Sequence, residues 1–71
     1  MDSTDVKRLE AYLKKTLGNE SVAVMKRPQA KDSLEVMING EFIGIIYKDD
    51  DEGEISYPFH MTILDEDLSE V

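Results

Sequence analysis

The chain has 71 residues, no cysteine and a formal charge of −8 at neutral pH. This length allows one small domain, residues 1–71, and the lack of cysteine excludes disulfides and thiolate metal sites. The acidic excess argues against non-specific nucleic-acid binding, which needs clustered Lys and Arg. No apolar run reaches the roughly 20 residues that cross a bilayer, and the N-terminus lacks the apolar core of a signal peptide. We therefore expect a cytoplasmic protein that binds neither nucleic acid nor membrane.

Charge is divided unevenly along the chain. Residues 1–31 contain seven basic and four acidic side chains, whereas residues 32–71 contain one basic side chain, Lys48, and twelve acidic ones. An acidic half of this kind favours solubility and attraction to basic partners. The simpler interpretation is a solvated acidic surface, and the pattern alone leaves both open.

The first predicted element is a helix over about residues 4–17. Apolar residues recur at spacings of three, four and four, which places one apolar stripe along the helix: Val6, Leu9, Leu13 and Leu17. Ser3 or Thr4 is suited to cap its start. Gly18-Asn19 is a typical C-cap and turn signal. These features predict a helix that packs against the rest of the protein through one face.

The next elements are strands. Residues 21–27 are short and β-branched, and they end in Lys26-Arg27 before Pro28, which suits an edge strand. After a polar connection, residues 34–47 predict a hairpin around Asn39-Gly40, the sequence typical of a two-residue type I′ turn. Such a loop fixes the register: we expect Ile38 opposite Glu41, Met37 opposite Phe42, Val36 opposite Ile43 and Leu34 opposite Ile45.

That register divides the hairpin between two faces, because neighbouring side chains in a strand point in opposite directions. The face toward the helix would carry Leu34, Val36, Ile38, Ile43, Ile45 and Tyr47. The other face would carry Glu35, Met37, Phe42, Gly44 and Ile46.

The remainder of the chain is predicted to be one loop, one strand and a tail. Residues 48–54 are mostly acidic, and Gly53 permits a turn. Residues 55–64 alternate as a strand whose odd-numbered side chains face the helix, and Pro58 requires an edge strand or a bulge. Residues 65–71 form an acidic tail with room for one helical turn. The predicted fold is α+β: an N-terminal helix on one face of a four-stranded antiparallel meander sheet.

In this arrangement Met37, Phe42 and Ile46 lie on a sheet face that no element is assigned to cover. Clustered large apolar groups on an open face are typical of a partner surface. A second copy is one candidate partner, because it would enlarge a small core. The alternative is that the tail covers these residues with Leu68 and Val71.

The acidic loop is the main candidate for chemistry: Asp49, Asp50, Asp51, Glu52 and Glu54. It fails the EF-hand pattern, because with Gly53 at the sixth position Lys48 and Phe59 would stand where oxygen ligands are required. Weak binding of a divalent cation stays open. The other interpretation is a solvated turn that repels self-association and attracts basic surfaces.

The remaining titratable and nucleophilic residues make no catalytic pattern. Asp32 and Glu35 lack the differing environments that an acid/base pair needs. His60 is a lone histidine with no sequence-local partner. The sequence therefore predicts no catalytic residue, no cofactor, no metal ligand set and no enzyme activity.

Three stretches carry a family resemblance: KRLEAYLKKTLGN (7–19), KDSLEVMINGEFIGIIYKDDDEGE (31–54) and SYPFHMTILDEDL (56–68). Together they resemble a short alphaproteobacterial family of uncharacterised proteins, a domain of unknown function. The resemblance implies a bacterial, cytoplasmic protein and brings no catalytic residue, cofactor or substrate. We expect a small acidic non-enzymatic protein-interaction module; the alternative is a weak divalent-cation-responsive module acting through residues 49–54.

Overall fold

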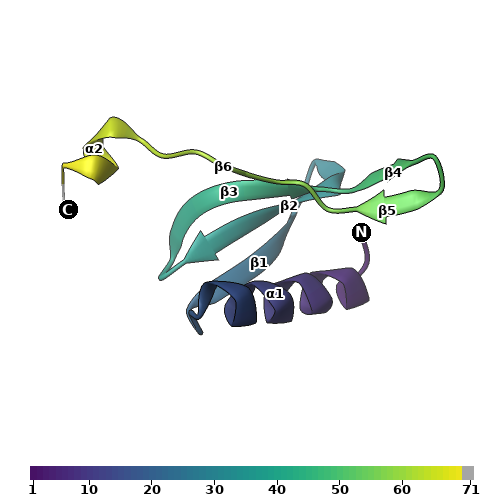
Figure 1. Ribbon diagram of the computed structural model, residues 1–71, viewed down its shortest axis with the longest axis horizontal. Helices are drawn as coiled ribbons and strands as arrows, with labels where there is room; N and C mark the ends of the chain where they lie inside the picture. Colours follow the sequence, from purple (N-terminus) through teal and green to yellow (C-terminus); the bar gives the residue numbers. More distant parts are fainter. Residues whose placement is uncertain (70–71) are drawn as a thin grey trace.

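The computed structural model describes residues 1–69, and Figure 1 shows their arrangement. In chain order the elements are α1 (Ser3–Leu17), β1 (Val22–Arg27), β2 (Ala30–Ile38), β3 (Glu41–Tyr47), β4 (Asp49–Asp51), β5 (Glu54–Ser56), β6 (Phe59–Met61) and α2 (Asp65–Leu68). A four-stranded antiparallel sheet has the order β1-β2-β3-β6, and β4 and β5 form a two-stranded ribbon. The predicted α+β arrangement, a helix followed by a four-stranded antiparallel sheet, is confirmed.

Helix α1 has the expected extent and a different N-cap. The cap is Asp2, whose Oδ1 accepts the backbone N–H of Asp5 at 2.9 Å, so the assignment to Ser3 or Thr4 is wrong. A carboxylate is favoured there, because it satisfies a free N–H and complements the helix dipole. The helix ends as predicted at Gly18, which is left-handed with φ of 63°.

The central hairpin turns where the sequence predicts and then departs from the predicted register. Asn39 and Gly40 both have positive φ, and Met37 pairs with Phe42. Beyond that pair a β-bulge at Ile43 shifts the register by one residue, so that Val36 pairs with Gly44. The predicted pairs of Val36 with Ile43 and Leu34 with Ile45 are therefore wrong, and Leu34 pairs instead with Ile46.

Because of the bulge, the side chains at the end of β3 point to the opposite sheet face from the one predicted. Ile46 is only 1% exposed and belongs to the core, whereas the sequence had placed it on the open face. Ile45 and Tyr47 alternate with it and therefore point away from the core, contrary to prediction. The buried core residues come from α1, β1, β2 and β3: Leu13, Val22, Val24, Leu34, Val36 and Ile46.

The predicted acidic loop and last strand are organised differently in the structure. The acidic residues form the ribbon β4–β5, whose turn is Glu52-Gly53, both at positive φ. The predicted single strand over residues 55–64 is divided at Pro58, which separates β5 from β6. Strand β6 is the edge strand next to β3, and the Pro58 carbonyl accepts the N–H of Tyr47 at 2.9 Å. A proline at an irregular edge is as predicted.

The chain after β6 runs away from the sheet and ends in the single turn α2 (Figure 1). Leu68 is 58% exposed and covers no other element of the described chain. Val71, the other residue expected to fold back over the sheet, lies outside the described residues. No helix within residues 1–69 combines the length and the apolar character needed to cross a bilayer.

Candidate functional site

The sheet face that points away from α1 is the first candidate surface. We call it the second face and define it by its large apolar side chains: Met25, Met37, Phe42, Ile45 and Tyr47. Met25, Phe42 and Tyr47 are exposed, and Phe42 is 49% exposed. Glu35 lies among these groups, because it pairs with Met25 on β1 and with Ile45 on β3. No described element covers this face.

Two of the three residues predicted for a partner interface lie together on the second face. Met37 and Phe42 form a cross-strand pair, whereas Ile46 is buried under α1 and Ile45 takes its place. The signal for this change was Gly44, because a glycine within a strand often marks a bulge or a close backbone approach. A Cβ at position 44 would clash with the His60 carbonyl and lie 2.7 Å from Phe59 Cε1.

His60 stands at the border of the second face. It pairs with Ile45, and its ring meets that of Tyr47 edge-on with centroids 5.3 Å apart. Its side chain is exposed. The geometry gives His60 an aromatic neighbour on the surface.

The acidic ribbon β4–β5 projects beyond the end of the sheet (Figure 1). All five of its carboxylates are exposed: Asp49, Asp50, Asp51, Glu52 and Glu54. Among residues 1–69, no three His, Asp or Glu side chains converge as a metal site would require. Weak binding of a divalent cation by this ribbon stays a prediction. The structure shows five exposed carboxylates close together in the ribbon.

An apolar groove between α1 and the β6 side of the sheet is the second candidate surface. It has a volume of about 730 Å³. Asp5 and Arg8 contribute the polar part of its lining, and the rest is apolar: Leu9, Ala11, Tyr12, Leu13, Ile46, Tyr57 and Phe59. Tyr12 is 63% exposed. Sequence reasoning had assigned Leu9, Tyr57 and Phe59 to a closed core and missed this opening.

The groove exists because one helix is too narrow for the sheet. A helix is about 10 Å across and strands are about 4.8 Å apart, so a single helix covers about two strands. Helix α1 packs mainly against β1 (Figure 1). The sheet face at β3 and β6 is therefore only partly covered by α1. In the sequence, the presence of one predicted helix for four predicted strands was the feature that could have indicated this opening.

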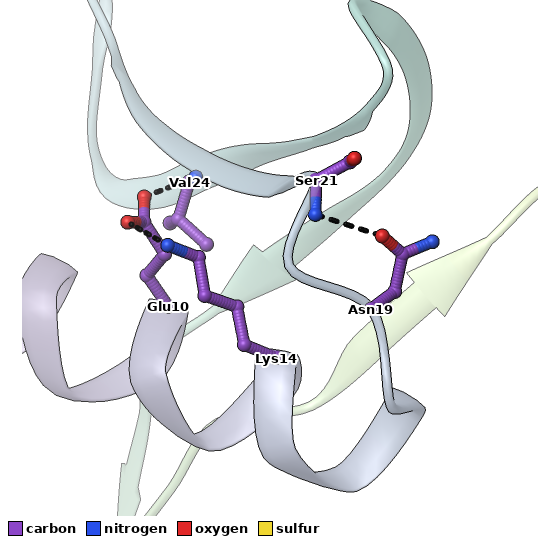
Figure 2. Close-up of polar contacts among 5 residues, drawn as sticks. All are labelled: Glu10, Lys14, Asn19, Ser21 and Val24. Carbon is purple, nitrogen blue, oxygen red and sulfur yellow. Dashed lines mark hydrogen bonds and ion pairs between the residues drawn. The ribbon is translucent and has the colours of Figure 1, made fainter.

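A polar contact fixes α1 at the β1 edge of the sheet. The Glu10 carboxylate accepts the Val24 N–H at 2.9 Å and lies 3.5 Å from Lys14 Nζ (Figure 2). At the start of β1, Asn19 Oδ1 accepts the Ser21 N–H at 2.7 Å (Figure 2). Glu10 thus occupies an outward N–H of an edge strand, which discourages pairing of that edge with another chain.

The polar side chains of the described chain are satisfied within it where they are buried. The pKa of Asp2 is lowered, chiefly because its carboxylate accepts the Asp5 N–H. Among residues 1–69 no buried side-chain nitrogen or oxygen lacks a hydrogen-bond partner. The two arrangements with obvious binding capacity are therefore apolar: the second face and the groove.

Comparison with known proteins identifies the family of this chain. Residues 5–67 match the family described as "Protein of unknown function (DUF3126)". No curated protein and no solved structure matches the chain. Because the match spans most of the sequence and includes most of α1, the whole sheet and most of α2, the chain belongs to the DUF3126 family of proteins of unknown function.

Proposed function

We propose that this chain is a small non-enzymatic protein-interaction module that binds a partner protein through its second face. The observation that carries the proposal is the open apolar surface around Met37, Phe42 and Ile45, which no described element covers. Contiguous apolar groups on a sheet face are expensive to leave in water and mark interaction surfaces. The setting we propose is the cytoplasm of an alphaproteobacterium, in line with the resemblance of residues 31–54 and 56–68.

The charges around the second face indicate the chemistry of its partner. Glu35 lies within the face, between Met25 and Ile45. The acidic ribbon continues from β3 beyond one end of the face. Two copies packed face to face would bring these like charges together, which disfavours that dimer. The best fit is another protein with an apolar centre and a rim of Lys and Arg.

Site-specific photocrosslinking tests this proposal. A photoreactive amino acid at Phe42 should form an adduct with a basic protein in the native cytoplasm, and higher salt should reduce the yield because it screens the charges. Leu17 is the matched control position, since it is 47% exposed and lies on α1. We expect no shared adduct from Leu17, and Met37→Asp should abolish the adduct from Phe42 while the far-UV circular dichroism stays unchanged.

Three results would each contradict part of the proposal. An absence of any adduct from position 42 would remove the second face as a binding surface. An adduct with twice the mass of the chain would replace the basic partner with a second copy. A yield that does not depend on salt would remove the role proposed for the acidic ribbon.

A further inference from the structure

The segment after β6 carries apolar side chains that the rest of residues 1–69 leaves uncovered. We call residues 62–69 the C-terminal arm. Ile63 is 63% exposed, Leu64 is 50% exposed and Leu68 is 58% exposed. Their local backbone is nevertheless organised, because the Leu64 N–H donates to Asp67 Oδ2 at 3.0 Å and closes the turn of α2. A helix of one turn is not stable alone in water, so an ordered arm needs a surface against which to pack.

The groove between α1 and β6 matches the arm in its apolar character, and its lining offers one cation, Arg8, to the carboxylates of the arm. Its lining is apolar and open to solvent at Tyr12, and the charged groups in its lining are Asp5 and Arg8. The arm places Asp65, Glu66 and Asp67 immediately after Leu64. An apolar segment followed by carboxylates therefore fits an apolar groove that has Arg8 in its lining.

The direction of the chain indicates that the arm enters the groove of another molecule. Tyr57 and Phe59 form the sheet side of the groove, whereas the arm leaves from the other end of β6 after Met61. At that end the Thr62 N–H lies 3.4 Å from the Ile43 carbonyl, which directs the arm away from α1 (Figure 1). To reach its own groove the arm would have to reverse at Thr62 and give up this contact.

We propose that the groove of each chain binds the C-terminal arm of a second copy, in a reciprocal homodimer. Each molecule supplies one arm and one groove, so the exchange is closed by a two-fold axis and stops at two chains. It would also cover the apolar surface that α1 is too narrow to cover. This inference goes beyond the proposed function because it uses a different surface, and the second face stays free in the dimer.

Complementation between two variants of the full-length chain tests the exchange. Tyr12→Glu blocks the groove with a charge at an exposed position, and Ile63→Ser with Leu68→Ser removes two of the three exposed apolar side chains of the arm. By light scattering across a dilution series, the unmodified chain should be a dimer and each variant a monomer. An equimolar mixture should form a heterodimer, because one intact arm still meets one intact groove. Its dissociation constant should be at least tenfold weaker than that of the unmodified dimer.

The controls separate this proposal from other modes of association. Phe42→Asp alters the second face and should leave the dimer intact, so failure of either proposal can be recognised independently of the other. Far-UV circular dichroism establishes that each variant is folded. If Tyr12→Glu does not fold, Arg8→Glu serves in its place, and its dissociation constant should recover when the arm carries Asp67→Lys.

Any of three results would overturn the exchange. The unmodified chain could be a monomer over the whole dilution series. The arm variant could stay a dimer, as a groove-to-groove contact would allow. The mixture of variants could stay monomeric, which would show that arm and groove do not bind each other.

Discussion

At the scale of single residues, Gly44 determines how β3 meets its two neighbours. It pairs with Val36 on one side, after the bulge, and with Met61 on the other. Its missing side chain lets the backbone of β6 approach closely, since a Cβ would meet the His60 carbonyl. Gly44 does not have a positive φ. The requirement for glycine here is therefore steric rather than conformational.

Gly44→Ala should destabilise the fold by about 1–3 kcal/mol, the usual cost of an added group in a packed site. The backbone of β6 has to move to admit the methyl group, so the loss should appear in urea unfolding followed by far-UV circular dichroism. Gly53→Asn is the matched control: its φ of 80° is tolerated by Asn, and nothing lies within 4 Å of an added Cβ. An unchanged urea midpoint for Gly44→Ala would show that the backbone of β6 moves aside without a loss of stability, which would contradict this prediction.

At the scale of elements, the start of α1 should respond to acid through its cap. The pKa of Asp2 is lowered from its ordinary value of 3.8, first by the hydrogen bond from the Asp5 N–H. Because the folded-state pKa is the lower one, the contribution of Asp2 to stability is complete above the unfolded-state pKa. It is lost as pH falls through the folded-state pKa.

Below pH 4, therefore, the first turn of α1 should loosen in the unmodified chain. The amide resonance of Asp5 should shift with a midpoint below 3.8, the ordinary pKa of Asp2. In Asp2→Asn the same resonance should lose that transition, because the side-chain oxygen still accepts the hydrogen bond and has no proton to gain. A transition of equal size in both proteins would assign it to another carboxylate.

At the scale of the whole molecule, the acidic half of the chain should make stability depend on salt. Residues 32–71 contain twelve acidic side chains and one basic one, and five of the acidic ones lie on the ribbon β4–β5. Exposed like charges repel each other in water by about 1 kcal/mol or less per close pair. The Debye length falls from about 30 Å at 0.01 M salt to about 8 Å at 0.15 M, so added salt weakens this repulsion.

The free energy of unfolding, measured by urea titration, should therefore rise by on the order of 1 kcal/mol between 0.01 M and 0.15 M NaCl. The urea midpoint should rise with it. A variant with Asp50→Asn, Glu52→Gln and Glu54→Gln is the control, and its salt response should be smaller. An equal response in both proteins would show that the ribbon does not contribute to the repulsion. A fall of the midpoint with salt would contradict the interpretation as a whole.

The sequence by itself determined the features that depend on neighbouring residues. The packing of Val6, Leu9 and Leu13 on one face of α1, the left-handed Gly18 and the turn at Asn39-Gly40 are present as predicted. Leu17, the last residue of the predicted stripe, is instead exposed. The irregularity at Pro58 is also present as predicted. Each of the confirmed features is set by local steric and hydrogen-bonding preferences, which a short segment carries with it. For the same reason Met37 and Phe42 were correctly placed together, since they lie within two pairs of the turn.

Only the tertiary structure decided which face the rest of β3 presents and how much of the sheet α1 covers. A bulge of one residue reverses every side chain beyond it, so the exchange of Ile45 for Ile46 depended on how closely β6 packs against Gly44. The groove depended likewise on where α1 lies across the strands. Both are contacts between segments distant in sequence, and their geometry is fixed by packing rather than by any local preference.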